Sequence, residues 1–435
     1  MLAEGTGLGY CTASMHSRIT ATLGPLWKRV VGAFFAHFFR CLLLAVSISQ
    51  WVVLGYLWPA VRHLPIAAQV AGPLFIYAVN HALALRTQRQ RRDRAPVGGM
   101  PRLYYAVSCT CLFCVIFVLF NNALWLTAKV LLGALAAQAG TVQAHHMRIY
   151  SELDSVFEWL ANAGMASIAV AFAYGYTIGQ RRLRVRQFTL PLRNCPPAWS
   201  GLRIVQISDI HIGQNIDRIQ LAGFVQRAND LHPDILCITG DIADSPSADL
   251  ENFLPILAGL RARYGVYAIL GNHDHYAGAD EVEAALRRLT SFTVLRDQHT
   301  TVEVNGHCLR IIGLDDYGED WARGRKLIPY LEAAMAAAPE AEPVLLLSHR
   351  PDVFARAAEH GVALTLAGHT HGGQIGIPWF GGRVRNVAEF MTEFDRGLFE
   401  RNGSYLYVNC GLGVTGQRIR LNTPREIAVM QVVGC

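Results

Sequence analysis

Apolar residues follow two different patterns in the two halves of the chain. Between about residues 30 and 180 they form long runs, and a helix needs roughly 20 mostly apolar residues to cross a bilayer. Tryptophans lie near the ends of these runs, as is typical of a membrane–water interface. The pattern predicts four membrane-spanning helices, at residues 41–58, 64–85, 103–126 and 159–178, of which the first could start earlier, through residues 30–35.

Beyond residue 200 the apolar runs are short and are bounded by glycine, proline or polar residues, which is typical of buried strands. Five strands are predicted, at residues 202–207, 235–238, 266–270, 344–347 and 362–366. Apolar residues recur at helical spacing between them, at residues 220–231, 280–289 and 326–338. We therefore expect a membrane region at residues 1–186, an extended, proline-containing linker at 187–200 and an α/β domain at 201–435.

Histidine, aspartate or asparagine follows each of the five predicted strands. The segments are Asp209-Ile210-His211, Gly240-Asp241, Gly271-Asn272-His273-Asp274, Ser348-His349 and Gly368-His369-Thr370-His371. Ligands of open α/β sheets bind at the carboxyl ends of the strands. Residues i and i+2 of an extended chain point to the same side, so the two ends of each Asp-x-His or His-x-His unit can reach one site.

Apart from His273 and Asp274, these segments offer two carboxylates, one amide and four imidazoles. Mixed oxygen and nitrogen donors with a shared carboxylate suit a pair of divalent metals such as Mn, Fe or Zn better than one structural zinc ion. Two metals about 3.5–4 Å apart are a recurrent arrangement in enzymes that hydrolyse phosphate esters. The pattern therefore indicates a metal-dependent phosphoesterase.

The five segments resemble, in order, the DxH, GD, GNH, H and GHxH pattern of the calcineurin-like metallophosphoesterase family. The resemblance extends from about Leu202 to the C-terminus. Residues 367–374, AGHTHGGQ, look like those of a membrane-associated bacterial subgroup, some members of which cleave lipid-linked or nucleotide-sugar pyrophosphates. The fold class that this implies is α+β, in which the multi-span transmembrane helices precede a four-layer α/β/β/α metallophosphoesterase sandwich.

The resemblance also implies a role for each site residue. One metal would be held by Asp209, His211 and His371, the other by Asn272, His349 and His369, and both by Asp241. His273 resembles the family's histidine that contacts the phosphate and can protonate the leaving group. Asp244 looks like the carboxylate that orients that histidine. Ser348 stands where some members have glycine before the lone histidine, a difference that does not change these assignments.

Arginines near the ends of the predicted spans indicate an orientation. Basic residues gather before the first span, in residues 86–94 between spans two and three, and in residues 181–186 after span four. Positive residues favour the cytoplasmic side of a membrane. With four spans all three groups share one side, so we expect a multi-pass protein of a bacterial inner membrane with a cytoplasmic catalytic domain. A large soluble helical domain is the alternative, and the basic flanks argue against it.

The net charge of +6 does not require a nucleic-acid partner. Much of the basic excess flanks the spans, where it would attract anionic membrane lipids, and no aromatic residues are interleaved with it as in a nucleic-acid platform. Ten cysteines are scattered through the spans and strands without zinc-site spacing. We expect them to be small apolar fillers rather than a disulfide framework, which suits a reducing cytoplasm.

The sequence thus predicts a membrane-bound hydrolase that acts on a phosphodiester or pyrophosphate bond by metal-activated hydroxide. Position beside the membrane favours a lipid-linked phosphate ester as substrate. Two alternatives remain, a phosphodiesterase of soluble nucleotides that is tethered to the membrane, and a membrane sensor that binds metal or nucleotide without turnover. The complete set of metal-binding residue types argues against the sensor.

Overall fold

The computed structural model describes residues 38–92, 99–139, 143–213, 215–246, 248–316, 328–337 and 342–433. This described chain forms two compact units, a helical one up to residue 176 and an α/β one from residue 177 onward. The possible early start of the first span, at residues 30–35, lies outside the described residues.

Four long helices make up the helical unit. They are α3 (Phe38–Leu57), α4 (Ile66–Arg92), α5 (Gly99–Ala139) and α6 (Gln143–Thr177). Each contains a stretch long and apolar enough to cross a membrane, at residues 40–57, 66–87, 99–135 and 149–181. The prediction of four apolar helices is therefore confirmed, although α5 and α6 run well beyond the ranges predicted for their spans.

Polar side chains inside the helical unit satisfy one another. The buried Asn80 amide donates to Ser47 Oγ (2.7 Å) and to Gln50 Oε1 (2.9 Å), and its oxygen accepts from the Tyr104 hydroxyl (2.6 Å). Interhelical hydrogen bonds of this kind join helices in an apolar surrounding, where water cannot satisfy the polar groups. The amide of Asn80 thus has a structural use, as a link between α3, α4 and α5.

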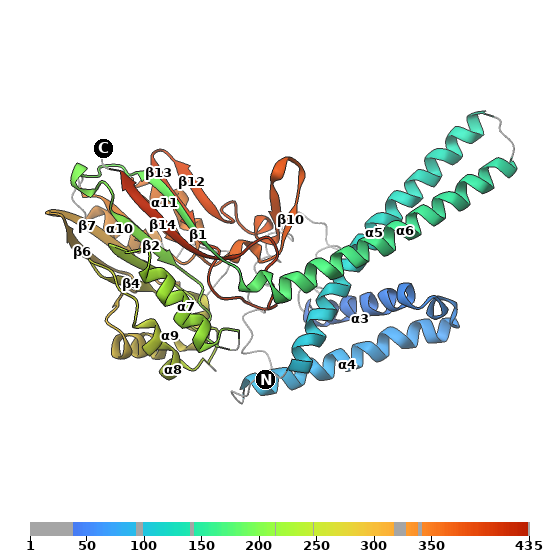
Figure 1. The fold of residues 1–435 in the computed structure, drawn as a ribbon, viewed down its shortest axis with the longest axis horizontal. Coiled ribbons are helices and arrows are strands. Elements are labelled where there is room, and N and C mark those ends of the chain that lie inside the picture. The colour runs from blue at the N-terminus through green and yellow to red at the C-terminus, as the bar shows by residue number, and fades with distance from the viewer. Residues whose placement is uncertain are drawn as a thin grey trace. The chain divides into compact units, whose positions relative to one another are not determined.

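The α/β unit contains two six-stranded sheets (Figure 1). The first has the order β1 (Leu183–Pro191), β14 (Arg425–Val433), β2 (Arg203–Ile207), β3 (Ile235–Thr239), β4 (Val266–Ile269) and β5 (Thr293–Val294). The second has the order β12 (Gly397–Arg401), β13 (Ser404–Val408), β9 (Leu364–Ala367), β8 (Val344–Leu347), β7 (His307–Gly313) and β6 (Gln298–Val304). All five strands predicted between residues 202 and 366 are present.

Alternate residues of the central strands enter different cores. In β3, Ile235 and Cys237 belong to a cluster that also contains residues of the second sheet, whereas Leu236 and Ile238 pack on the other side. That other cluster includes α7 (Arg218–Asn229), α8 (Leu250–Leu257) and α9 (Asn272–Leu289). Likewise α10 (Ile328–Ala336) and α11 (Phe354–Glu359) contribute to a cluster with β8. Successive residues of these strands are buried on opposite faces of the sheet, which explains why the strands are continuous apolar runs in the sequence.

Strand β1 joins the beginning of the unit to its end. It pairs in parallel with β14, which in turn pairs antiparallel with β2, and Figure 1 shows the green and red strands side by side. Residues 187–191, expected to lie in a linker, are part of this strand, and so are Arg184 and Arg186, which the sequence suggested as the flank of a span. Because these basic residues alternate with Leu183 and Val185, which pack against the core, the sequence pattern did not predict a strand here.

Candidate metal centre

The predicted ligand residues lie where parallel strands of both sheets end. Asp209, Asp241 and Asn272 follow β2, β3 and β4 of the first sheet, and His349 and His369 follow β8 and β9 of the second. A buried glutamine holds the two sheets in register beneath them, because Gln206 Nε2 donates to Thr239 Oγ1 (2.8 Å) and to the carbonyl of Ala367 (2.9 Å). The edges of the two sheets therefore present their polar side chains to one place.

A first cluster of possible metal ligands consists of Asp209, His211 and His371. The Nε2 atoms of the two histidines lie 3.0 Å apart, and His371 Nε2 lies 3.4 Å from Asp209 Oδ1. Two imidazole nitrogens that face each other at this distance, with a carboxylate beside them, are a donor set for a divalent cation. All three side chains are buried.

A second cluster consists of Asp241, His349 and His369. His349 Nε2 lies 3.2 Å from Asp241 Oδ2 and 3.3 Å from His369 Nδ1. The Nδ1 atom of His349 donates to the carbonyl of Thr239 (2.8 Å), so Nε2, which faces Asp241 and His369, is the ring atom that could bind a metal. Its orientation is thus set before any cation binds.

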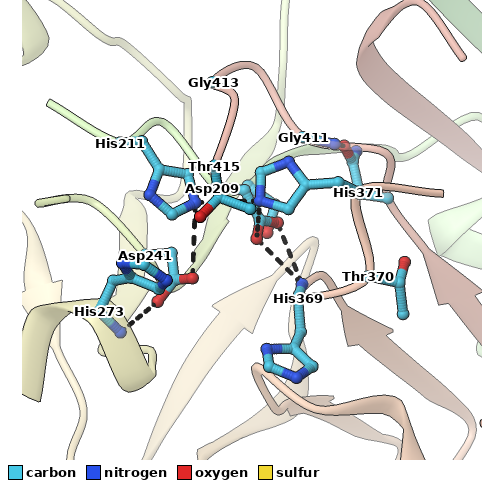
Figure 2. A network of polar contacts seen from close by, with 12 residues as sticks. Asp209, His211, Asp241, His273, His369, Thr370, His371, Gly411, Gly413 and Thr415 are labelled. Carbon is cyan, nitrogen blue, oxygen red and sulfur yellow. Dashed lines mark hydrogen bonds and ion pairs between the residues drawn. The ribbon is translucent and has the colours of Figure 1, made fainter. Parts of the chain in front are cut away.

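Asp241 connects the two clusters. Its Oδ2 atom lies 3.2 Å from Nε2 of His349 and 3.6 Å from Nε2 of His211. Its Oδ1 atom accepts the backbone N–H of His273 (2.8 Å), as Figure 2 shows. A carboxylate that touches a histidine of each cluster is placed to bridge two cations.

The remaining predicted ligand, Asn272, supports the same arrangement. It is the first residue of α9 and is buried. Within the described part of the chain its Oδ1 atom has no hydrogen-bond partner. A buried amide oxygen without a partner is costly, and coordination of a metal would remove that cost. The residues present therefore fit a pair of divalent metals.

The backbone at the ligands is strained. Asp209, His211, Asp241, His369 and His371 all have φ between 49° and 71°. The left-handed region is rare for residues other than glycine and costs of order 1–3 kcal/mol for each residue. Such strain concentrates at functional sites. Five of the seven predicted ligands share it, so the fold holds them in these positions against their own preference.

Two glycines allow the ligand segments to approach closely. A Cβ atom at Gly271 would collide with Asp241, and one at Gly368 would collide with Ser208 and with the carboxylate of Asp209. The glycine before Asn272 and the glycine before His369 are therefore needed for close contact between neighbouring strand ends.

Electrostatics favour the metal-binding forms of His369, His371 and Asp241. Burial lowers the pKa of His369 and His371, and positive neighbours, Arg350 for His369 and both His211 and Arg420 for His371, lower it further. Burial raises the pKa of Asp241, but His349 and the other nearby histidines hold it well below its ordinary range. Neutral imidazole and ionised carboxylate are the ligand forms. Around the other two histidines, nearby carboxylates outweigh burial, raising the pKa of His211 and raising that of His349 to about 10.

His273 belongs to neither of these two clusters, but it forms a third group of possible metal ligands with His211 and Asp244. Its Nδ1 donates to the backbone carbonyl of Asp244 (3.0 Å), so Nε2 is the ring atom left for another partner. Its side chain is 25% exposed, unlike the buried ligands. The Asp244 carboxylate lies 3.7 Å from His273 Nδ1 but 3.3 Å from His211 Nδ1. Asp244 thus contacts a predicted ligand as well as the histidine that it was expected to orient.

Asp274, for which the sequence pattern predicted no role, binds backbone N–H groups next to the predicted ligands. It is fully buried in the first turn of α9 and accepts the backbone N–H groups of Ala243 (2.7 Å), Gly271 (2.9 Å) and Ile242 (3.2 Å). Burial and the neighbouring Asp241 raise its pKa to about 6. It ties the segment after β3 to the segment after β4. Its position three residues after Gly271, at a helix N-terminus, was the available signal.

We expect Asp274→Ala to destabilise the protein by about 3 kcal/mol or more, since it leaves three buried N–H groups unpaired at roughly 1–3 kcal/mol each. The measurement is the thermal unfolding midpoint of the full-length protein. Asp280→Ala is the matched control, because Asp280 lies in the same helix, is 91% exposed and, among the described residues, pairs with Arg296. Equal midpoints for the two variants would show that Asp274 does not hold the loops.

The buried Arg420 contacts a predicted ligand and the backbone segment next to the site. Arg420 Nη2 lies 3.2 Å from His371 Nδ1 and donates to the carbonyls of Gly411 (3.1 Å) and Gly413 (2.6 Å). The segment that it holds lies against Asp209 (Figure 2), whose carbonyl accepts the N–H of Gly413. Arg418, two residues earlier in the chain, instead donates to Gln180 Oε1 (2.9 Å).

Comparison with known proteins agrees with this geometry. Residues 202–373 match the model of the calcineurin-like phosphoesterase family. An uncharacterized metallophosphoesterase of Aquifex aeolicus is 32% identical over 255 residues, which are 58% of this chain and 92% of the relative. One of Bacillus subtilis is 29% identical over 280 residues, 64% of this chain and 94% of that protein. The chain therefore belongs to the calcineurin-like metallophosphoesterase family and is a phosphoesterase.

One relative extends across both units. A bovine protein, described as a transmembrane protein with metallophosphoesterase domain, is 28% identical over 409 residues, which are 89% of each chain. Together with the four helices long and apolar enough to cross a bilayer, this identifies a membrane protein with a metallophosphoesterase domain.

Proposed function

We propose that this protein is a membrane-bound, dinuclear-metal-dependent hydrolase of a phosphodiester or pyrophosphate bond in a lipid-linked substrate. The observation that carries the proposal is the pair of ligand clusters joined by Asp241. In the proposed assignment Asp209, His211 and His371 hold one metal, Asn272, His349 and His369 hold the other, and Asp241 holds both. The mixed oxygen and nitrogen donors suit Mn, Fe or Zn.

Two metals, when bound, supply Lewis acidity and a water of lowered pKa. The chain contributes the geometry around them. Asp241 and the buried histidines would hold the cations with little rearrangement of their own, since Thr239, Asp244 and the strained backbone set the positions of these side chains. The partly exposed His273, whose Nδ1 donates to the carbonyl of Asp244, would use Nε2 to protonate the leaving oxygen and to stabilise charge on the phosphoryl group. Asp244 would keep that ring in place.

The membrane region supports the choice of a lipid-linked substrate over a soluble one. A domain whose chain follows a candidate span directly is held where lipid headgroups are concentrated. The test uses the full-length protein in lipid nanodiscs with Mn, Zn, Mg or Fe. Its substrates are a nucleotide-diphosphate lipid, the same headgroup without acyl chains, and a soluble diester.

We expect metal-dependent turnover of the nucleotide-diphosphate lipid with a kcat/KM at least about tenfold above that of its acyl-free form, a difference of about 1.4 kcal/mol. Equal values would favour the membrane-tethered nucleotide phosphodiesterase instead. Metal-dependent binding of every substrate without turnover would favour the non-catalytic sensor. The soluble diester controls for an intact catalytic centre.

The proposed orientation places both termini and the catalytic domain in the cytoplasm of a bacterial cell. Basic residues at 86–94 and 181–186 support this orientation, because such residues favour the cytoplasmic side. We expect a reporter that works only in the cytoplasm to be active when fused after Cys435, and a reporter that works only after export to be silent. The reverse pattern would place the active site outside, and with it the substrates.

A further inference from the structure

An exposed apolar patch adjoins the segment that carries His371. Strands β10 (Gly376–Pro378) and β11 (Val384–Asn386) form an antiparallel hairpin, and η7 (Val387–Phe390) follows it. The patch consists of Ile377, Trp379, Phe380, Val387, Phe390 and Met391, which are all exposed. Phe380 and Phe390 are 85% and 88% exposed, and the rings of Trp379 and Phe380 meet edge to face. Soluble surfaces rarely gather large apolar side chains in this way, and such patches mark contact surfaces.

The patch is fixed to the candidate metal centre from two sides. Gly376 donates its N–H to the carbonyl of Leu421 (2.7 Å) and accepts from Asn422 Nδ2 (2.8 Å). Asn386 Nδ2 donates to Asp395 Oδ2 (2.6 Å), and the carbonyl of Asp395 accepts from Thr370 Oγ1 (2.6 Å), next to His371. A surface that bound this patch would therefore set the position of the catalytic site.

The chain enters the α/β unit beside the base of the hairpin. The fourth candidate span extends to Arg181, so Gln180 lies at its end. Gln180 Oε1 accepts from Arg418 Nε (2.9 Å), only three residues before Leu421, which binds Gly376. The base of the hairpin is thus linked through few residues to Gln180, near the C-terminal end of the fourth candidate span.

Residue types in the patch suit one kind of surface. Tryptophan and phenylalanine beside arginine are typical of segments that lie in the interface of a bilayer, with aromatic rings at the headgroups. Arg383 and Arg385 lie on the same hairpin and are exposed, and Arg385 pairs with Glu389 at 2.9 Å. Basic side chains beside the aromatic tip would attract anionic lipid headgroups.

We propose that the hairpin patch inserts into the headgroup region of an anionic bilayer and holds the catalytic site at the membrane surface. Trp379 and Phe380 enter the interface, and Arg383 faces the lipid phosphates. The proposal concerns where the domain is held and does not depend on which phosphoester it cleaves.

The test places a photoreactive benzoylphenylalanine at position 380 of the full-length protein in nanodiscs that contain phosphatidylglycerol. Ile219 is the matched control position, because it is 87% exposed and apolar but lies on α7. We expect lipid adducts at position 380 at several times the yield at position 219. Thermal unfolding midpoints equal to that of the unsubstituted protein show that both labelled proteins are folded, whether or not they turn over substrate.

Three results would overturn the proposal. They are no lipid adduct at position 380, equal lipid adducts at both positions, and an adduct between two copies of the chain, which would make the patch a dimer contact. A second variant gives the same decision without a label. Trp379→Ser with Phe380→Ser should increase hydrogen exchange of residues 376–391 in nanodiscs several-fold, and an unchanged rate would contradict membrane insertion.

Discussion

Replacement of Asp241 with asparagine is expected to remove nearly all turnover. The Asp241 carboxylate lies within 3.6 Å of a histidine nitrogen in each cluster, so one substitution weakens both proposed metal sites. Loss of a single preorganised electrostatic group costs about 10²–10³ in kcat, and a group shared by two cations should cost at least that much. The measurement is kcat on a soluble diester, together with metal content by mass spectrometry.

The control for this experiment is Asp280→Asn, which changes an exposed carboxylate of the same domain. It should leave both activity and metal content unchanged. Activity close to that of the unsubstituted protein in Asp241→Asn, with two metals still bound, would remove the dinuclear assignment.

Replacement of His273 with alanine is expected to separate catalysis from metal binding. The His273 ring is partly exposed and belongs to neither the Asp209 nor the Asp241 cluster, although it forms a third possible ligand group with His211 and Asp244. General acid help is worth typically 10²–10⁴-fold, so kcat should fall by roughly that factor while both metals remain bound. His349→Ala, which removes a proposed ligand, should lose metal as well as activity.

The same pair of variants shows how this assignment could fail. Equal loss of metal in His273→Ala and His349→Ala would make His273 a ligand. Asp244→Asn should lower kcat less than His273→Ala does. Because Asp244 also contacts His211, that variant should weaken metal affinity about 10–100-fold, the usual cost of losing a carboxylate behind a metal-binding histidine.

The strands that lead to the site could be predicted because each is buried on both faces. Strands β2, β3, β4, β8 and β9 are short apolar runs, and each ends at a polar segment. Parallel pairing within each sheet places these segments at the carboxyl edge of that sheet, and residues from both edges, between 209 and 371, meet at the site. The family model and the relatives confirm the metallophosphoesterase domain itself.

Other features depend on contacts that the sequence does not reveal. Strand β1 escaped prediction because Arg184 and Arg186 interrupt its apolar pattern, and its partner β14 lies more than 240 residues away. Asp274 and Arg420 are buried charged residues whose roles depend on contacts with the backbone. Asp274 accepts three N–H groups, and Arg420 donates to backbone carbonyls beside His371. No local sequence pattern distinguishes Arg420 from Arg418, although Arg420 contacts His371 whereas Arg418 binds Gln180.

The most direct test of a two-metal centre is the stoichiometry of activation. The full-length protein would be stripped with a chelator and titrated with Mn while bound metal and hydrolysis of a soluble diester are followed together. We predict that two ions bind per chain and that turnover appears mainly with the second. Full activity at one ion per chain, or activity that survives removal of all metal, would contradict the account.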